Sequence, residues 1–310
     1  MVSARRLYRL QLAFAAVGIA AVVLALGIAL TRVDFSLTSL DAVGEACRGM
    51  GLTHLNAASL AVLGLSSFAI AGLGLALRSI IAQLRAQRRF LRTLGELEPA
   101  KAAGRNVVIT PDPRPQAFCT GLLRPRVFVS RGTVDLLDEE ELRAVVAHEA
   151  HHAERRDPLR IFAARVLGEA LFFLPALRRL ADRYAALAEL AADEAAVRQT
   201  GDRRALAAAL LAFEETPSAT VVGIVPERVD HLFGTRARWE LPLALMIGTA
   251  VTLAGLIAFA ARTAEATGRG SVDMPQLLAQ ACMFAMAAAP ALAGAALLLG
   301  VNRALARRRG

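Results

Sequence analysis

The sequence predicts a mainly α-helical membrane protein, in which four transmembrane helices surround a cytoplasmic α+β domain with a small β-sheet. Two observations predict this fold class. Hydrophobic residues make up 55% of the 310 residues, above the roughly 45–50% of soluble domains, and they gather in four uncharged blocks. The net charge of +9 comes from arginine-rich segments beside those blocks. We therefore expect a transmembrane hairpin with a basic extension at 1–92, the cytoplasmic domain at 93–239, and a second hairpin with a basic tail at 240–310.

Each uncharged block is long enough to cross a bilayer as a helix. The blocks are 10–30, 55–77, 241–261 and 275–302. A hydrocarbon core of about 30 Å requires roughly 20 apolar residues, whereas runs of about 10–14 suit buried core helices better. The first block could instead be a signal peptide, but it is longer than the apolar region of one. No A-x-A site with a polar mature start follows it either.

Arginines orient the predicted spans. The basic segments are 1–9, 78–92 and 303–310, which hold twelve arginines and no acidic residue. By the positive-inside rule these segments, both termini and the domain between the hairpins face the cytoplasm, in a multi-pass protein of the cell membrane. The rest of the chain, with 24 basic and 27 acidic residues, has a net charge of −3. The high pI therefore gives no support for direct nucleic-acid binding, and it indicates the lipid bilayer as a partner.

The cytoplasmic domain is expected to begin with short strands and to continue with helices. The β-prone runs are 107–110, 116–120 and 127–130, after a break at 98–104. Flanking prolines predict edge strands in a small sheet. The expected helices are 78–97, 138–155, 180–199 and 203–214, with a further one starting at Asp157-Pro158. Asp138 and Glu141 have the spacing of a capping box. The apolar run 161–177 contains two charged residues, so we expect it in the domain core or against the membrane face, not as a fifth span.

The helix at 138–155 contains a metal-binding motif. Its residues His148-Glu149-Ala150-His151-His152 read H-E-x-x-H. Two histidines four positions apart share one helix face, where neutral imidazoles bind Zn²⁺, and the glutamate beside the first can take a proton from the attacking water. His151 is off this register, so we expect it at the surface. A solvated polar helix face is the plain alternative, but the motif lies mid-helix behind an apolar stretch.

A catalytic zinc site needs a third protein ligand. His54 and His231 fit poorly, since one lies across the predicted membrane and the other in a loop-like region. Glu189 and Asp193 share a helix face, so Glu189 could be the ligand and Asp193 could accept a hydrogen bond from a ligand imidazole. An exposed acidic face explains the same pattern equally well. Asp157, five residues after the motif, is a weaker candidate ligand.

Several stretches between 116 and 213 share the pattern of one family. They are Gln116-Ala117-Phe118 with 121–127, 140–149 with Arg155-Arg156-Asp157, Glu189-Leu190-Ala191-Ala192-Asp193, and 197–210. Together they resemble the membrane-embedded gluzincin peptidases, most closely the type found in the bacterial β-lactam sensor-transducers (the BlaR/MecR family). The resemblance implies a zincin-like endopeptidase with one Zn²⁺ per chain, held by His148, His152 and Glu189, and with Glu149 as the general base. The related heat-shock and prenyl-protein peptidases share the same zinc pattern.

Two functions are consistent with these residues. In the first, the protein hydrolyses peptide bonds of a protein substrate: a regulator such as a transcriptional repressor, a membrane protein or itself. The backbone of Gln116, Ala117 and Phe118 would hold that substrate as an added strand. In the second, the protein is a catalytically silent member of the peptidase fold that serves in membrane signalling or as a scaffold. The chain ends eight residues after Asn302, so we expect no C-terminal penicillin-binding sensor domain.

Overall fold

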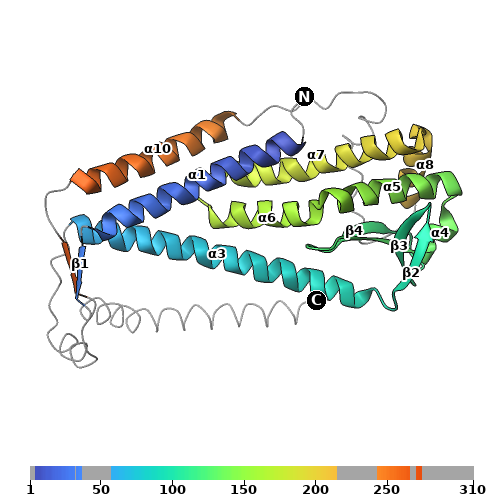
Figure 1. Cartoon of the computed structure of the whole chain (residues 1–310), viewed down its shortest axis with the longest axis horizontal. Helices are drawn as coiled ribbons and strands as arrows, with labels where there is room; N and C mark the ends of the chain where they lie inside the picture. The colour runs from blue at the N-terminus through green and yellow to red at the C-terminus, as the bar shows by residue number, and fades with distance from the viewer. Residues whose placement is uncertain (1–3, 32, 37–56, 215–242, 266–269, 274–310) are drawn as a thin grey trace, which may run out of the picture. The chain divides into compact units, whose positions relative to one another are not determined.

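The computed structural model describes residues 4–31, 33–36, 57–214, 243–265 and 270–273 (Figure 1). The chain falls into two compact units, one made of 1–21 and 69–255 and the other of 22–68 and 256–310. The first unit contains a sheet, the helices with the metal motif and parts of three apolar helices. In the second unit, β1 (Val33–Ser36) pairs in parallel with β6 (Gly270–Asp273).

A four-stranded mixed sheet precedes the helices with the metal motif in the first unit. Its strands are β2 (Glu98–Ala102), β3 (Arg105–Thr110), β4 (Ala117–Thr120) and β5 (Arg126–Ser130), in the order β2-β3-β5-β4. β3 and β5 are parallel, and the two outer pairs are antiparallel. The predicted small sheet is confirmed, but the expected break at 98–104 is wrong, since it holds β2. Ala103 and Gly104 have φ values of 50° and 75°, the left-handed pair that lets a two-residue turn follow the strand twist.

Five helices accompany and follow the sheet. They are α4 (Arg131–Leu136), α5 (Glu139–Arg155), α6 (Asp157–Ala170), α7 (Pro175–Thr200) and α8 (Arg203–Glu214). The predicted capping box of α5 is confirmed, since Asp138 accepts from the backbone N–H of Glu141 and the Glu141 carboxylate accepts from the backbone N–H of Asp138. A single left-handed residue, Arg156 with φ 53°, separates α5 from α6. α7 begins at Pro175 and not at 180, because proline suits the first turn of a helix.

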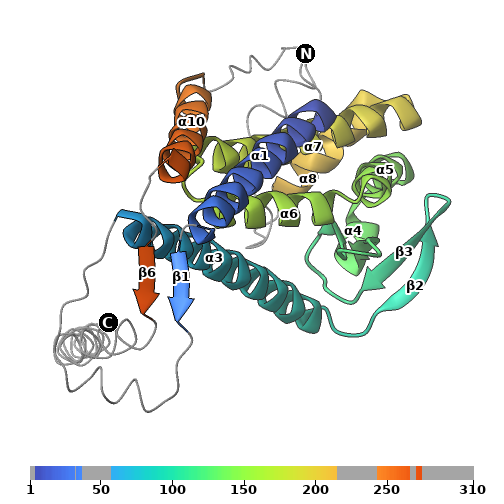
Figure 2. The same cartoon turned by 60° about the vertical axis from the view of Figure 1, so that its left-hand side comes forward.

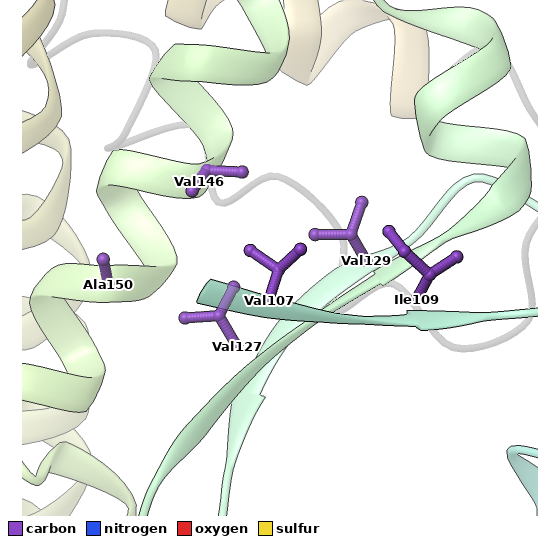
Figure 3. Packing of buried hydrophobic residues seen from close by; sticks show 6 residues of the cluster. All are labelled: Val107, Ile109, Val127, Val129, Val146 and Ala150. Carbon is purple, nitrogen blue, oxygen red and sulfur yellow. The ribbon is translucent and has the colours of Figure 1, made fainter. Parts of the chain in front are cut away.

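Helices cover both faces of the sheet. On one face, β3 and β5 pack against α5 through Val107, Ile109, Val127, Val129, Val146 and Ala150 (Figure 3). On the other face, Phe118 of β4 and Phe128 of β5 stack at 5.3 Å between ring centroids, and Phe90 of α3 (Ala57–Thr93) lies edge-on to Phe118 at 5.0 Å. Successive residues on a strand point to opposite faces, so burying both faces fixes β4 relative to α5.

Three apolar helices overlap the predicted spans. They are α1 (Ala4–Leu30), α3 and α10 (Leu243–Glu265). By length and composition Ala4–Ile28 and Gly64–Thr93 could cross a membrane, whereas Leu243–Phe259 is a shorter apolar helix. The fourth predicted span, 275–302, lies outside the described residues. Within the part of the chain that the structure describes, two apolar helices are therefore long enough to cross a membrane, where four spans were predicted for the whole chain.

The apolar run 161–177 lies beside α1 within the first unit. It forms the end of α6 and the start of α7, and residues 171–174 separate these helices. α1 runs alongside both of them in Figures 1 and 2, and Nε2 of Gln11 donates to the carbonyl oxygens of Ala164 (3.0 Å) and Leu177 (3.3 Å). The run is divided between two helices, so it does not form a single spanning helix. This agrees with the expectation that 161–177 is not a fifth span.

Candidate metal centre

Two histidines from α5 and one carboxylate from α7 converge. Nε2 of His148 lies 3.2 Å from Nε2 of His152. The Glu189 carboxylate approaches both, with one oxygen 3.5 Å from His148 Nε2 and the other 3.4 Å from His152 Nε2. One donor atom from each residue lies within 4.8 Å of the other two, so these three residues could hold a metal ion. Two imidazoles and a carboxylate are the donor set of a catalytic zinc site with an open position.

The other nitrogen of each imidazole faces a buried carboxylate. Nδ1 of His148 lies 2.9 Å from Oδ1 of Asp193, and Nδ1 of His152 lies 3.0 Å from Oδ2 of Asp157. The Asp193 residue is 0% exposed and Asp157 is 2% exposed. A carboxylate at Nδ1 keeps the proton there and leaves the Nε2 lone pair for a metal, and it also orients the ring. Asp157, considered above as a weaker candidate ligand, instead supports His152.

Tyr184 holds Asp157 in place. Its hydroxyl donates to Oδ1 of Asp157 at 2.7 Å, and a nitrogen of Arg160 lies 3.9 Å from the same oxygen. Burial alone would raise the pKa of Asp157, but the hydrogen bonds from His152 and Tyr184 outweigh it, so the pKa is below its usual value. Asp157 is therefore held as a carboxylate. Tyr184 was not predicted from the sequence, because it lies far along the chain from the motif and no local pattern indicates the contact with Asp157.

The charges around His148 favour a cation. Burial would lower the pKa of His148, but the Asp193 and Glu189 carboxylates, which accept hydrogen bonds from the imidazole, together with the charges of Glu149 and Asp193, raise it to about 10. Carboxylates that favour the protonated imidazole of His148 would also favour a bound metal ion, which competes with the proton for the same nitrogen. The acidic surroundings thus fit a divalent cation at the two Nε2 atoms and Glu189.

Glu149 lies close to the edge strand β4. It is half-buried on α5, and its charge acts on Cys119 of β4. Burial first, and then the charges of Glu149 and Asp157, raise the pKa of the Cys119 thiol to about 12. His151, expected at the surface, is half-buried and takes no part in the three-residue group. The predicted strand residues Ala117 and Phe118 lie on β4, and Gln116 immediately precedes it.

Comparisons with known proteins identify a family for this chain. The family model of peptidase family M48 matches residues 82–268. A protease HtpX homolog of Aquifex aeolicus is 39% identical over 70 residues, which cover 22% of this chain and 23% of that protein. A protease HtpX homolog of Salinibacter ruber is 40% identical over 70 residues, or 22% of this chain and 25% of that protein. The aligned part spans about a quarter of the length of these relatives, and no solved structure matches. The narrower resemblance to the BlaR/MecR type is not confirmed.

Proposed function

The chain belongs to peptidase family M48, and from that premise we propose that it is a membrane-bound, zinc-dependent endopeptidase acting on a protein substrate at the cytoplasmic face. The observation that supports this most directly is the convergence of His148, His152 and Glu189, with a buried carboxylate behind each imidazole. Family M48 supplies the class of reaction, and the three converging side chains supply a place for one Zn²⁺ per chain.

Each residue of the centre has a distinct role in peptide hydrolysis. His148, His152 and Glu189 would hold Zn²⁺, which when bound acidifies a water molecule and polarises the scissile carbonyl. Glu149 takes the proton of the attacking water and passes it to the leaving amine. Asp193 and Asp157 keep the two imidazoles in the orientation and tautomer that ligation requires.

The free edge of β4 would bind the substrate as an added strand. The backbone N–H of Ser130 donates to the carbonyl of Gln116 at 2.9 Å, and the N–H of Gln116 donates to the hydroxyl of Thr133 at 2.7 Å. Both backbone groups of Gln116 are therefore occupied. Along a strand of an antiparallel pair, the backbone N–H and C=O groups of successive residues point alternately toward the partner strand and away from it. Phe118 pairs with Phe128 of β5, so the N–H and C=O groups of its neighbours Ala117 and Cys119 point outward.

This arrangement refines the predicted substrate strand. Of the three residues that the sequence indicated, Ala117 would contact the substrate backbone, Phe118 would anchor β4 on the sheet, and Gln116 would fix the start of the strand. Cys119, which was not predicted from the sequence, would contribute the second set of backbone groups. Four backbone groups are enough to orient an extended peptide along β4, since main-chain hydrogen bonds provide affinity in strand addition.

The membrane arrangement belongs to the same proposal. The basic segments 1–9, 78–92 and 303–310 support a multi-pass topology in which both termini and the metal centre face the cytoplasm. The division into 1–92, 93–239 and 240–310 and the four spans follow from the same charges and blocks. The substrate would be a regulator such as a transcriptional repressor, a membrane protein or the chain itself. A repressor as substrate would give the protein the signal-transduction role that the BlaR/MecR resemblance implies.

The deciding experiment compares the wild type with Glu149→Gln in detergent with one equivalent of zinc. We expect Glu149→Gln to retain zinc and to lose about 10²- to 10⁴-fold in proteolysis of an unfolded test protein, the usual contribution of a general base. Glu140→Gln is the matched control, since Glu140 is exposed on the same helix. Equal proteolysis by the wild type and Glu149→Gln would exclude Glu149 as the base. An inactive wild type that still binds zinc would favour the silent signalling or scaffold protein.

A further inference from the structure

The connection between α6 and α7 is apolar, and it lies away from the sheet. We define the α6–α7 tip as residues 166–177. Its twelve residues contain one charged residue, Glu169, and include Leu171-Phe172-Phe173-Leu174. The side chains that flank it, Arg165 and Arg178, are exposed. An apolar tip between exposed arginines is the pattern of a segment that enters a bilayer from one side.

Three apolar helices contact the tip at small residues. A Cβ atom on Gly18 of α1 would lie 2.7 Å from Cδ1 of Leu174, and one on Gly72 of α3 would lie 2.8 Å from the carbonyl oxygen of Ala170. The hydroxyl of Thr249 in α10 accepts from the backbone N–H of Ala176 at 3.3 Å. Glycine and threonine are the residues that allow close helix contacts within membranes. The tip therefore packs directly on the helices that we place in the bilayer.

The three contacts give similar depths. Gly18 lies eight residues inside the block 10–30, and Thr249 lies eight residues inside the block 241–261. Gly72 lies five residues inside the end of the block 55–77 that faces the cytoplasm. At about 1.5 Å per helical residue these positions are about 12, 12 and 8 Å below the cytoplasmic ends of the helices. Against a hydrocarbon core of about 30 Å, all three place the tip within the cytoplasmic leaflet.

Polar side chains near the base of the tip bond to its backbone and to its single charged residue. Gln11, one residue inside the block 10–30, donates to the carbonyls of Ala164 and Leu177, just outside or at the ends of the tip. Arg178 pairs with Glu169, the single charged residue of the tip, at 3.9 Å, and donates from Nε to the carbonyl of Gly168 at 3.3 Å. Arg165, Arg178 and Arg179 are exposed, so their guanidinium groups can reach the headgroup layer.

We propose that the α6–α7 tip is a re-entrant element that inserts into the cytoplasmic leaflet, with lipid acyl chains as the partner of its exposed face. Phe172, 38% exposed, lies on that face. This inference rests on the membrane spans of the proposed function. It has a consequence for the metal centre, since Glu189 lies twelve positions after Leu177 on α7. At about 1.5 Å per residue, the centre lies no more than about 18 Å from the boundary of the hydrocarbon core.

Tryptophan reporters in lipid vesicles test the insertion. The single tryptophan, Trp239, is first replaced in the full chain by Trp239→Phe. Into this background we place Phe172→Trp, with Phe173→Trp as a second reporter of the tip. The positive control is Leu73→Trp, at a position of α3 that is 71% exposed. The negative control is Leu97→Trp, at a 45% exposed position beyond the end of α3.

The readout is quenching by phosphatidylcholine brominated on the acyl chain, in proteins that retain the thermal unfolding transition of the parent. We expect both tip reporters to lose emission as Leu73→Trp does, most strongly when bromine is on the headgroup half of the chain, while Leu97→Trp keeps its emission. If Leu73→Trp is quenched and the tip reporters are not, the insertion is wrong although the spans stand. If Leu73→Trp is not quenched either, the membrane spans of the proposed function are wrong as well. Zinc content and proteolysis then test the peptidase activity separately from the spans.

Discussion

The two halves of α7 differ in what they bury. In the N-terminal half, Ala176, Leu180 and Tyr184 are almost fully buried and form one apolar cluster with Leu7 of α1. In the C-terminal half, Glu189 and Asp193 face the histidines of α5. One continuous helix thus joins a hydrophobic contact with an apolar helix to a polar centre that needs accurate positioning. The apolar contacts of the first half hold α7 against its neighbours, and the second half contains the carboxylates of the centre.

Removing a ligand from the polar half should have the largest effect. We expect His148→Ala to lose stoichiometric zinc, since only His152 and Glu189 would remain of the three converging donors. Metal analysis of the purified protein measures this. His151→Ala, on the same helix but outside the group, is the control and should retain zinc. Full zinc content in His148→Ala would contradict the assigned centre.

Truncating a side chain in the apolar half should reduce stability and spare the metal. Leu180 is 1% exposed, so Leu180→Ala should destabilise the protein by about 2–5 kcal/mol through lost burial and a residual cavity. Chemical unfolding in detergent gives the free energy of unfolding, and Leu136→Ala, at a 44% exposed position, should change it little. If Leu180→Ala instead lost zinc at unchanged stability, the division between the two halves of α7 would be wrong.

Asp193→Asn tests the support of a ligand without removing it. An amide in place of the carboxylate orients the His148 ring less firmly, so zinc affinity should fall about 10- to 100-fold. Competition with a chelator measures the affinity. Glu194→Gln changes the neighbouring, partly exposed residue that pairs with Arg198, and it should leave the affinity unchanged. Equal affinities of Asp193→Asn and the wild type would show that the 2.9 Å contact with His148 has no supporting role.

Tyr184→Phe should have the smallest effect, and this effect should appear both in stability, which depends on the apolar half of α7, and in zinc affinity, which depends on the polar half. The ring remains in the apolar cluster, but Asp157 loses the hydroxyl donor at 2.7 Å. We expect about 1 kcal/mol of lost stability from the missing hydrogen bond, and a weaker loss of zinc affinity than in Asp193→Asn. The pKa of Asp157 should rise toward its usual value, because one of the hydrogen bonds that lowers it is gone. A loss of zinc affinity greater than that of Asp193→Asn would contradict this order.

Local patterns predicted the elements that contain the chemistry. The H-E-x-x-H spacing and the capping box of Asp138 both lie within one helix, where neighbours along the chain are neighbours in space. The break expected at 98–104 failed because β2 contains Pro99 and charged residues and forms only by pairing with β3. Likewise, α7 extends to Pro175 because its first turn is buried against α1 and α10. Local propensity does not contain these contacts.

By itself the sequence determined the two histidines that share one face of α5, the acidic pair on α7 and the small sheet, because each depends on spacing within one element or on composition. The peptidase class came from a resemblance, whose narrower BlaR/MecR form is not confirmed. Only the tertiary structure decided that Asp157 supports His152, that Tyr184 holds Asp157, and that Ala117 and Cys119 form the outward edge of β4. Tertiary structure also brought the α6–α7 tip against three apolar helices. These facts depend on which side chains meet after distant segments pack, and no local spacing specifies such meetings.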